Sequence, residues 1–174
     1  MPYAPGIAPT LLALVVAAAA PARPPTPPRA VVCAAGENAV VVDTGAHRLH
    51  LCWRGEVERT FVVALGIDGV DKRRQGDNRT PIGAYPLGAP RASLSFHTFV
   101  PVGYPTPAQA RMGFTGSAIG IHGPPRGAGG LARLLELVGV DWTAGCIAVA
   151  TDDDIDEIAG WLRRRGVKDV RLIR

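Results

Sequence analysis

The amino-acid sequence predicts one mostly-β domain with two short helices, and three observations carry that prediction. From Ala39 onward, short runs rich in β-branched residues alternate with turn residues, a pattern typical of strands joined by tight turns. The chain of 174 residues contains 21 Gly and 16 Pro, which favours many turns over long helices. Only two later segments have the apolar spacing and the end signals of a helix.

Most of the expected elements are strands. Residues 40–42, 47–53 and 60–64 are β-branched or alternate between apolar and polar side chains, so we expect them to form a β-meander. A turn-rich stretch then leads into the next expected strand. The later strands are expected at residues 84–87, 94–100, 119–122, 147–149 and 170–172.

The two helices are expected at residues 131–138 and from about residue 152 to 165. The first is predicted by apolar residues at i, i+3, i+4 and i+7 followed by a glycine, namely Leu131, Leu134, Leu135, Val138 and Gly139. The second begins at three aspartates, whose negative charges suit a helix N-terminus, and ends at three arginines and Gly166.

The N-terminal segment has the features of an export signal. Residues 7–20 are apolar but short for a membrane span, they end in Ala18–Ala20, and a proline-rich spacer follows at residues 21–28. We therefore expect residues 1–30 to be a signal peptide and spacer, with cleavage between Ala20 and Ala30, and residues 31–174 to be the folded domain. The alternative is a disordered or buried tail.

Composition and charge exclude some classes of protein. With 47% hydrophobic and 20% charged residues, the chain can bury a core and is not a disordered protein. The net charge of +4 includes two dense basic runs, residues 72–74 and residues 163–165. Neither run has neighbouring aromatic residues, so we expect solvated surface there and no nucleic-acid binding.

Cys146 is the candidate nucleophile. A free cysteine is more often a buried structural residue, and that alternative has to be weighed. Gly145 favours catalysis, because a glycine before a nucleophile lets the backbone turn sharply and leaves its N–H free to hydrogen-bond an oxyanion.

A cysteine nucleophile needs a base, because only a small fraction of an ordinary thiol is ionised at neutral pH. His122 ends an expected strand and precedes a Gly/Pro turn, so its ring is expected at a strand tip. His47 and His50 are expected on opposite faces of their strand, where they cannot share a metal. His97 lies among aromatic residues and is expected to be a packed histidine.

Other kinds of site lack support in the sequence. Residues 123–130 are rich in glycine but have neither the Lys-Ser/Thr pair of a phosphate-binding loop nor the dinucleotide fingerprint. The three cysteines are far apart and form no C-x-x-C pair, which argues against a zinc site.

Three segments in this order resemble the L,D-transpeptidase catalytic domain (YkuD family), and most closely its short periplasmic members. They are residues 76–83 (GDNRTPIG), 121–123 (IHG) and 141–148 (DWTAGCIA), and the resemblance covers about residues 39–174. Two positions depart from the family pattern. Many members have His or Lys where this chain has Ala144, and a polar or basic residue where it has Ala148, which affects the groups available to hold a substrate.

The resemblance implies a β-sandwich-like fold with the cysteine and the histidine at one end. It implies that Cys146 is the nucleophile and that His122 is the base that later acts as acid. It also implies that the Gly123 carbonyl orients the imidazole and that the N–H groups of Gly145 and Cys146 form the oxyanion hole. Covalent acylation of Cys146 by carbapenems is a further implication.

The implied reaction transfers the acyl group of a peptidoglycan tetrapeptide stem to an amine, with release of terminal D-alanine. The acceptor is a neighbouring stem, a free D-amino acid or a lysine of an anchored protein. All the reacting groups belong to the protein, so no metal or organic cofactor is expected. We expect the protein in the periplasm or cell wall, with no membrane span after signal removal. The alternatives are an L,D-carboxypeptidase- or amidase-type hydrolase, and a non-catalytic wall-binding module.

The other two cysteines, Cys33 and Cys52, are candidates for a disulfide. An exported protein meets an oxidising compartment, and a hairpin could bring their Cα atoms within the roughly 4.4–6.8 Å that a disulfide requires. The alternative is two unrelated buried cysteines.

Overall fold

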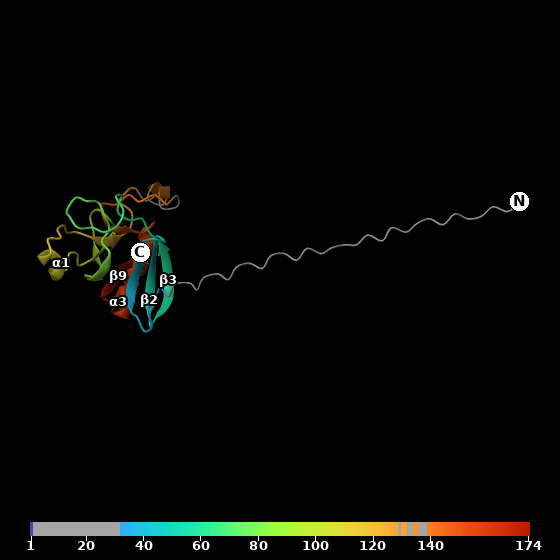
Figure 1. Ribbon diagram of the computed structural model, residues 1–174, viewed down its shortest axis with the longest axis horizontal. Coiled ribbons are helices and arrows are strands. Elements are labelled where there is room, and N and C mark those ends of the chain that lie inside the picture. Colours follow the sequence, from blue (N-terminus) through green and yellow to red (C-terminus); the bar gives the residue numbers. More distant parts are fainter. Residues whose placement is uncertain (2–31, 129, 132–133, 136–138) are drawn as a thin grey trace. The chain divides into compact units, whose positions relative to one another are not determined.

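The computed structural model describes residue 1 and residues 32–128, 130–131, 134–135 and 139–174. The mostly-β fold is confirmed: the described strands form two mixed sheets, of five and four strands (Figure 1). The signal peptide and spacer predicted for residues 1–30 fall, apart from Met1, outside the described residues. None of the helices in the described part of the chain is long and apolar enough to cross a membrane.

The five-stranded sheet contains the predicted meander. β1 (Ala39–Asp43) pairs antiparallel with β2 (Arg48–Trp53), and β2 pairs antiparallel with β3 (Glu56–Val62). β1 also pairs in parallel with the last strand, β9 (Asp169–Ile173), so the last strand lies inside the sheet, between β1 and β4 (Gly83–Pro86). The order across the sheet is β3 (Glu56–Val62), β2 (Arg48–Trp53), β1 (Ala39–Asp43), β9 (Asp169–Ile173) and β4 (Gly83–Pro86).

The four-stranded sheet brings together the motifs singled out in the sequence. Its order is β5 (Arg91–Ala92), β6 (Thr98–Pro101), β7 (Gly120–His122) and β8 (Ile147–Ala148). β7 and β8 are parallel, with His122 opposite Ala148. Two backbone hydrogen bonds of 2.9 Å between Ala64 and Ala148 connect β8 to the chain leaving β3.

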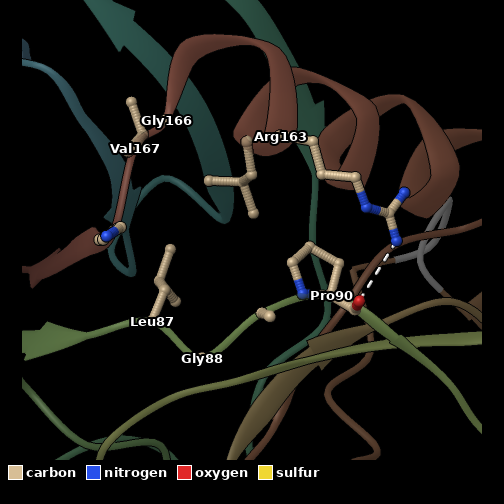
Figure 2. Close-up of a pocket in the computed structure, with 9 residues that line it drawn as sticks. Leu87, Gly88, Pro90, Arg163, Gly166 and Val167 are labelled. Carbon is tan, nitrogen blue, oxygen red and sulfur yellow. Dashed lines mark hydrogen bonds between the residues drawn. The ribbon is translucent and has the colours of Figure 1, made fainter.

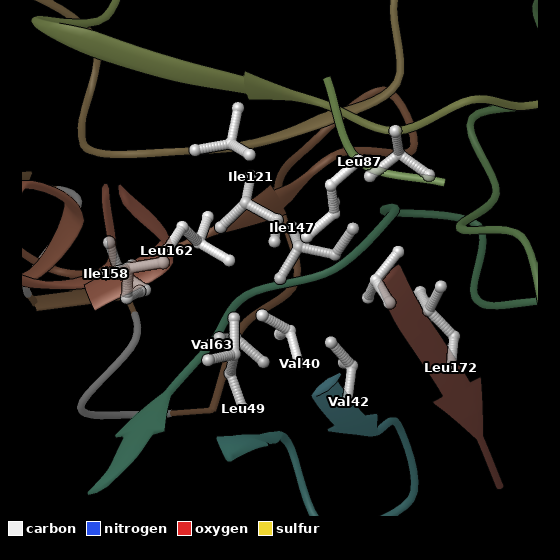
Figure 3. Packing of buried hydrophobic residues seen from close by; sticks show 14 of the residues in the cluster. Val40, Val42, Leu49, Val63, Leu87, Ile121, Ile147, Ile158, Leu162 and Leu172 are labelled. Atoms are coloured by element: carbon white, nitrogen blue, oxygen red, sulfur yellow. The ribbon is translucent and has the colours of Figure 1, made fainter. Parts of the chain in front are cut away.

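A single large core lies between the sheets and the long helix. Figure 3 shows side chains of β1, β7, β8, β9 and α3 (Asp152–Arg165) pointing toward one another. The residues labelled in Figure 3 are all buried and aliphatic: Val40, Val42, Leu49, Val63, Leu87, Ile121, Ile147, Ile158, Leu162 and Leu172. Burial of aliphatic surface of this kind is the main force holding the fold together.

The helix α3 has the ends that the sequence predicts. The Thr151 hydroxyl accepts a hydrogen bond from the Asp154 N–H at 3.1 Å, which caps the first turn. Gly166 ends the helix with a left-handed φ of 67°, a conformation that glycine adopts without steric cost. Ile155, Ile158 and Leu162 are buried on one face, as the helical spacing predicts.

The predicted disulfide is present, and it explains why β1 is apolar on both faces and does not alternate between apolar and polar side chains. Cys33 and Cys52 are bonded, with their Cα atoms 5.7 Å apart. Together with Ala39 and Val41 they form a second, small core on the other face of the five-stranded sheet. Both faces of β1 are therefore covered, and a strand buried on both faces is expected to be apolar throughout.

Removing this disulfide is expected to lower the free energy of unfolding by about 3 kcal/mol, because the bond closes a loop whose ends are 19 residues apart. Urea unfolding of the Cys33→Ser/Cys52→Ser variant measures the loss. Cys146→Ser is the matched control, since it removes a thiol without removing a cross-link. A double variant as stable as this control would contradict the prediction.

Some local expectations were wrong or fall outside the described residues. The strand expected at 94–100 begins only at Thr98, and the helix α1 (Pro107–Arg111) was not expected. The helix expected at 131–138 includes residues outside the described set; its described residues 130–131 and 134–135 are helical.

An apolar pocket lies where the end of α3 passes the chain that follows β4. Leu87, Gly88 and Pro90 face Gly166 and Val167 across it, and Arg163 closes one side through a 3.2 Å hydrogen bond to the Pro90 carbonyl (Figure 2). Neither Cys146 nor His122 lines this pocket.

Candidate active site

The two parallel strands β7 and β8 bring His122 and Cys146 together. His122 lies opposite Ala148, and Cys146 is the residue immediately before β8. Continuing the register by one residue places Cys146 beside Gly120, two positions from His122 and on the same face. The intervening pair, Ile121 and Ile147, points the other way into the core. The sheet therefore fixes both residues on one rigid surface.

A backbone carbonyl fixes the tautomer of His122. Its Nδ1 lies 2.6 Å from the carbonyl oxygen of Gly123. A carbonyl can only accept, so Nδ1 carries the proton and Nε2 keeps the lone pair. This is the contact that the sequence resemblance implies for Gly123. The arrangement leaves one ring nitrogen able to take up a proton.

Aromatic rings surround the His122 imidazole. The Phe96 ring stacks on it at 3.8 Å between centroids, and Phe99 and Trp142 lie 6.2 and 6.0 Å away. The side chain is only 1% exposed. Burial lowers the pKa of His122 below its ordinary value, although the hydrogen bond to Gly123 works in the opposite direction. At neutral pH the ring is therefore uncharged and can act as a base.

Cys146 is the free cysteine of the chain, and its thiol is protonated at rest. The Sγ atom is 3.5 Å from the Ala118 carbonyl oxygen. Burial raises the pKa of the Cys146 thiol, and a backbone hydrogen bond from Gly120 and the charge of Lys72 only partly offset this. The resting pair is thus a neutral thiol beside a neutral imidazole, so proton transfer to His122 has to accompany attack.

Gly145 has the sharp backbone turn expected before a nucleophile, but its N–H is not free. Its φ is 118°, a region that favours glycine. The N–H donates to the Thr143 hydroxyl at 3.1 Å, and that hydroxyl donates in turn to the Cys146 carbonyl at 2.8 Å. The expectation of a free Gly145 N–H was wrong because a residue in its own motif supplies the acceptor.

We expect Gly145→Ala to destabilise the site severely. An alanine Cβ would lie 2.5 Å from the Arg79 carbonyl oxygen, in addition to the cost of the positive φ. Gly36→Ala is the matched control, since its φ of 73° is also positive but no atom lies within 4 Å of the added Cβ.

Urea unfolding should show Gly145→Ala losing about 1–3 kcal/mol more stability than Gly36→Ala, the usual cost of overpacking. Equal losses in the two variants would mean that the contact with Arg79 relaxes freely.

The other histidines are held apart from the site. His47 Nε2 is 3.1 Å from an Asp141 carboxylate oxygen, and His50 Nδ1 is 2.9 Å from the Thr60 hydroxyl. His97 is not packed in an aromatic core as expected, since its Nε2 pairs with Asp156 at 2.8 Å on the surface. Across the described residues, no group of three His, Cys, Asp or Glu side chains could hold a metal ion.

Sequence reasoning missed three residues that shape the site. Thr143 lies in the motif around Cys146, but its role was not expected: its hydroxyl links two backbone groups of the nucleophile turn. Phe96 was read as part of a strand, although it covers His122. Lys72 was expected in a solvated run, yet it is only 5% exposed, whereas Arg73 and Arg74 are exposed as predicted.

Comparisons with known proteins agree with the motifs and the fold. The family model for the L,D-transpeptidase catalytic domain matches residues 37–170. No curated protein sequence matches the chain significantly.

Solved structures share the fold. The helical cell shape determining protein Pgp2 from Campylobacter jejuni is similar with a TM-score of 0.57 and 23% identity, covering 77% of this chain and 46% of that one. Bd1075 of Bdellovibrio bacteriovorus gives 0.55 and 19% over 82% and 51%. An L,D-transpeptidase from Mycobacterium smegmatis gives 0.50 and 16% over 78% and 58%.

This chain therefore spans about half the length of the structures it resembles. At these identities the structures support the fold, while the family model matches most of the chain. The chain belongs to the L,D-transpeptidase catalytic domain family.

Proposed function

We propose that this protein is a peptidoglycan L,D-transpeptidase that uses Cys146 as nucleophile and His122 as general base. One observation carries the proposal: the free Cys146 directly precedes β8, the buried His122 ends the adjacent parallel strand β7, and Gly123 fixes the imidazole tautomer. Family membership supplies the substrate class.

The first half of the reaction forms a thioester. His122 Nε2 takes the Cys146 proton as the sulfur attacks the carbonyl of the residue that precedes the terminal D-alanine of a tetrapeptide stem. The C–N bond then breaks, and the imidazolium returns the proton to the leaving amine of D-alanine. Gly123 steadies the imidazolium because its carbonyl accepts the Nδ1 proton throughout.

The Cys146 N–H is the donor that we assign to the developing oxyanion. Backbone donors at such a position stabilise charge that exists only in the transition state. The Gly145 N–H can join it only when its hydrogen bond to Thr143 is released. Gly145 therefore acts first through its conformation, which turns the chain sharply just before Cys146.

The second half of the reaction depends on the acceptor. An amine attacks the thioester, loses its proton to His122 and forms a new amide bond, and the released thiolate regains the proton. A neighbouring stem, a free D-amino acid and a lysine of an anchored protein are all chemically suitable amines. Water in place of the amine would make the enzyme an L,D-carboxypeptidase through the same acyl-enzyme.

The masses of the products distinguish these outcomes. Purified protein is incubated with tetrapeptide muropeptides, with and without an added amine acceptor. The products are then separated and their masses are measured by mass spectrometry. A transpeptidase gives a dimer or an acceptor adduct together with free D-alanine, whereas a hydrolase gives tripeptide under both conditions. Unchanged tetrapeptide in every reaction would contradict the proposal.

Export to the periplasm or cell wall forms part of the same proposal, because peptidoglycan lies outside the membrane. The predicted signal at residues 1–30 provides the route. N-terminal sequencing of protein from cell envelopes should find a start between Ala20 and Ala30. Protein retained in the cytosol with Met1 intact would contradict this localisation.

A further inference from the structure

Lys72 is a buried cation that the proposed mechanism does not use. Its side chain is only 3% exposed, and its Nζ contacts an Asp77 carboxylate oxygen at 2.7 Å and the Arg74 carbonyl at 3.1 Å. A lysine is rarely buried this completely without a specific charged partner. Of the two lysines in the chain, the other, Lys168, is exposed.

Asp77 ties this cation to the surrounding loop. Its carboxylate accepts hydrogen bonds from the N–H groups of Arg73, Arg74 and Arg79 at 2.8, 2.9 and 3.2 Å. Burial alone would raise the pKa of the Asp77 carboxyl, but the backbone N–H groups and Lys72 bring it well below its usual range. The Asp77 carboxylate is therefore ionised at any pH at which the protein would work.

The loop held by this ion pair contacts the nucleophile turn. The Arg79 carbonyl fills the space beside Gly145, 2.5 Å from where a Cβ would stand. On the other side, Lys72 Cε is 3.1 Å from the Cβ position of Gly116. Two residues further along, the Ala118 carbonyl lies 3.5 Å from Cys146 Sγ. Short segments of backbone thus connect the buried ammonium to the thiol from two directions.

We propose that Lys72 is a positioning residue for Cys146. Paired with Asp77, it holds the loop of residues 72–80 against Gly145, and its buried positive charge favours the thiolate that forms during attack. The proposal rests on the proposed function, since it assigns Lys72 a role through the nucleophile.

The charges around the two groups agree with this role. Lys72 is among the effects that lower the pKa of Cys146 against the opposing effect of burial. Tyr104 donates its hydroxyl to the Lys72 carbonyl, but burial raises the pKa of Tyr104 to about 12, so it adds no charge at neutral pH. His122 is uncharged at neutral pH because burial lowers its pKa. We therefore expect the thiol to respond to Lys72, with Asp77 acting through its ion pair with Lys72.

The test is the pH dependence of Cys146 alkylation by iodoacetamide, which needs no substrate. Lys72→Met should shift the alkylation profile to higher pH and slow alkylation about threefold to tenfold near pH 8, because the cation is lost and Asp77 remains. Asp77→Asn should shift it to lower pH, because Lys72 loses its counter-charge. Lys168→Met, the matched control, should leave the profile unchanged.

The opposite signs distinguish electrostatics from simple loosening. If the ion pair only held the loop in place, either substitution would let water reach the thiol. Both variants would then move the alkylation profile in the same direction, toward that of an ordinary cysteine. That result would overturn the proposal, as would an unchanged profile in folded Lys72→Met. If Lys72→Met fails to fold, Lys72→Arg is tested in its place. It keeps the positive charge and should therefore show an alkylation profile close to that of the wild type.

Turnover of tetrapeptide tests the same role separately. Lys72→Met should lower kcat more than it changes KM, because the charge acts on the attacking sulfur and does not touch substrate. Full turnover by Cys146→Ser would remove the proposed function itself, whereas the alkylation profiles would still report whether Lys72 acts on the thiol. The two failures are therefore distinguishable.

Discussion

Cys146→Ser is expected to abolish turnover of a tetrapeptide stem while the protein remains folded. A serine hydroxyl has a far higher pKa than a thiol, so its proton is much harder to transfer to His122, whose own pKa is lowered by burial. The substitution is nearly isosteric, and the thiol makes only a long contact of 3.5 Å to the Ala118 carbonyl, so little packing is lost.

Release of D-alanine measures turnover, and circular dichroism with urea unfolding measures the fold. The Cys33→Ser/Cys52→Ser variant is the reverse control, since it should lose stability but keep the nucleophile. Substantial turnover by folded Cys146→Ser would show that another group attacks the substrate.

His122→Ala is expected to lower kcat/KM by at least about 100-fold, the usual effect of losing a general base. In the wild-type enzyme, activity should be lost as pH falls through the pKa of His122, because the protonated ring cannot accept a proton. Since burial lowers that pKa, the acid limb should lie below pH 6.5, the ordinary value for histidine.

The variant should also change the shape of the pH profile. Without the base, reaction has to wait for the thiol to ionise by itself, and burial raises the pKa of that thiol above its ordinary value of 9.0. Residual activity should therefore increase steadily with pH toward the pKa of the thiol, without the plateau near neutrality that the wild-type enzyme should show. His97→Ala is the control, because His97 pairs with Asp156 on the surface and should leave the profile unchanged. A normal profile in His122→Ala would exclude His122 as the base.

The elements that local pattern decides were predicted well. The meander, α3 and the last strand follow from β-branched runs, capping residues and helical spacing, which act over a few neighbouring residues. Helix α1 could have been found, because Thr106 and Gln109 form a capping box and a proline occupies the first helical position. The high glycine and proline content of the chain favours turns, so no helix was expected there.

Features that depend on contacts between distant segments could not be predicted. Lys72 appears in a basic run, and only the fold shows that Tyr104 and Gly116 close over it. Phe96 lies over His122 because a segment before β6 folds back onto β7, which no local spacing indicates. The hydrogen bond from the Gly145 N–H to the Thr143 hydroxyl is local, but it depends on the φ of 118° at Gly145. A glycine permits this φ without requiring it, so the sequence does not predict the bond.

The predicted disulfide lies between these two cases. Pairing Cys33 with Cys52 required both the expected hairpin and the expected oxidising compartment, and neither alone was sufficient. The structure shows the bond and adds its packing role, since it covers the face of β1 that carries Val41. The compartment itself stays a prediction.

Intact-protein mass spectrometry tests the acyl-enzyme most directly. Purified protein is mixed with a tetrapeptide muropeptide without an amine acceptor, quenched in acid within seconds and digested to map any adduct. We predict a mass increase equal to the substrate minus D-alanine, located on Cys146, absent in Cys146→Ser and removed by hydroxylamine as a thioester should be. D-alanine released by the wild-type protein with no adduct on Cys146 at any time, or an adduct on a different residue, would contradict the account.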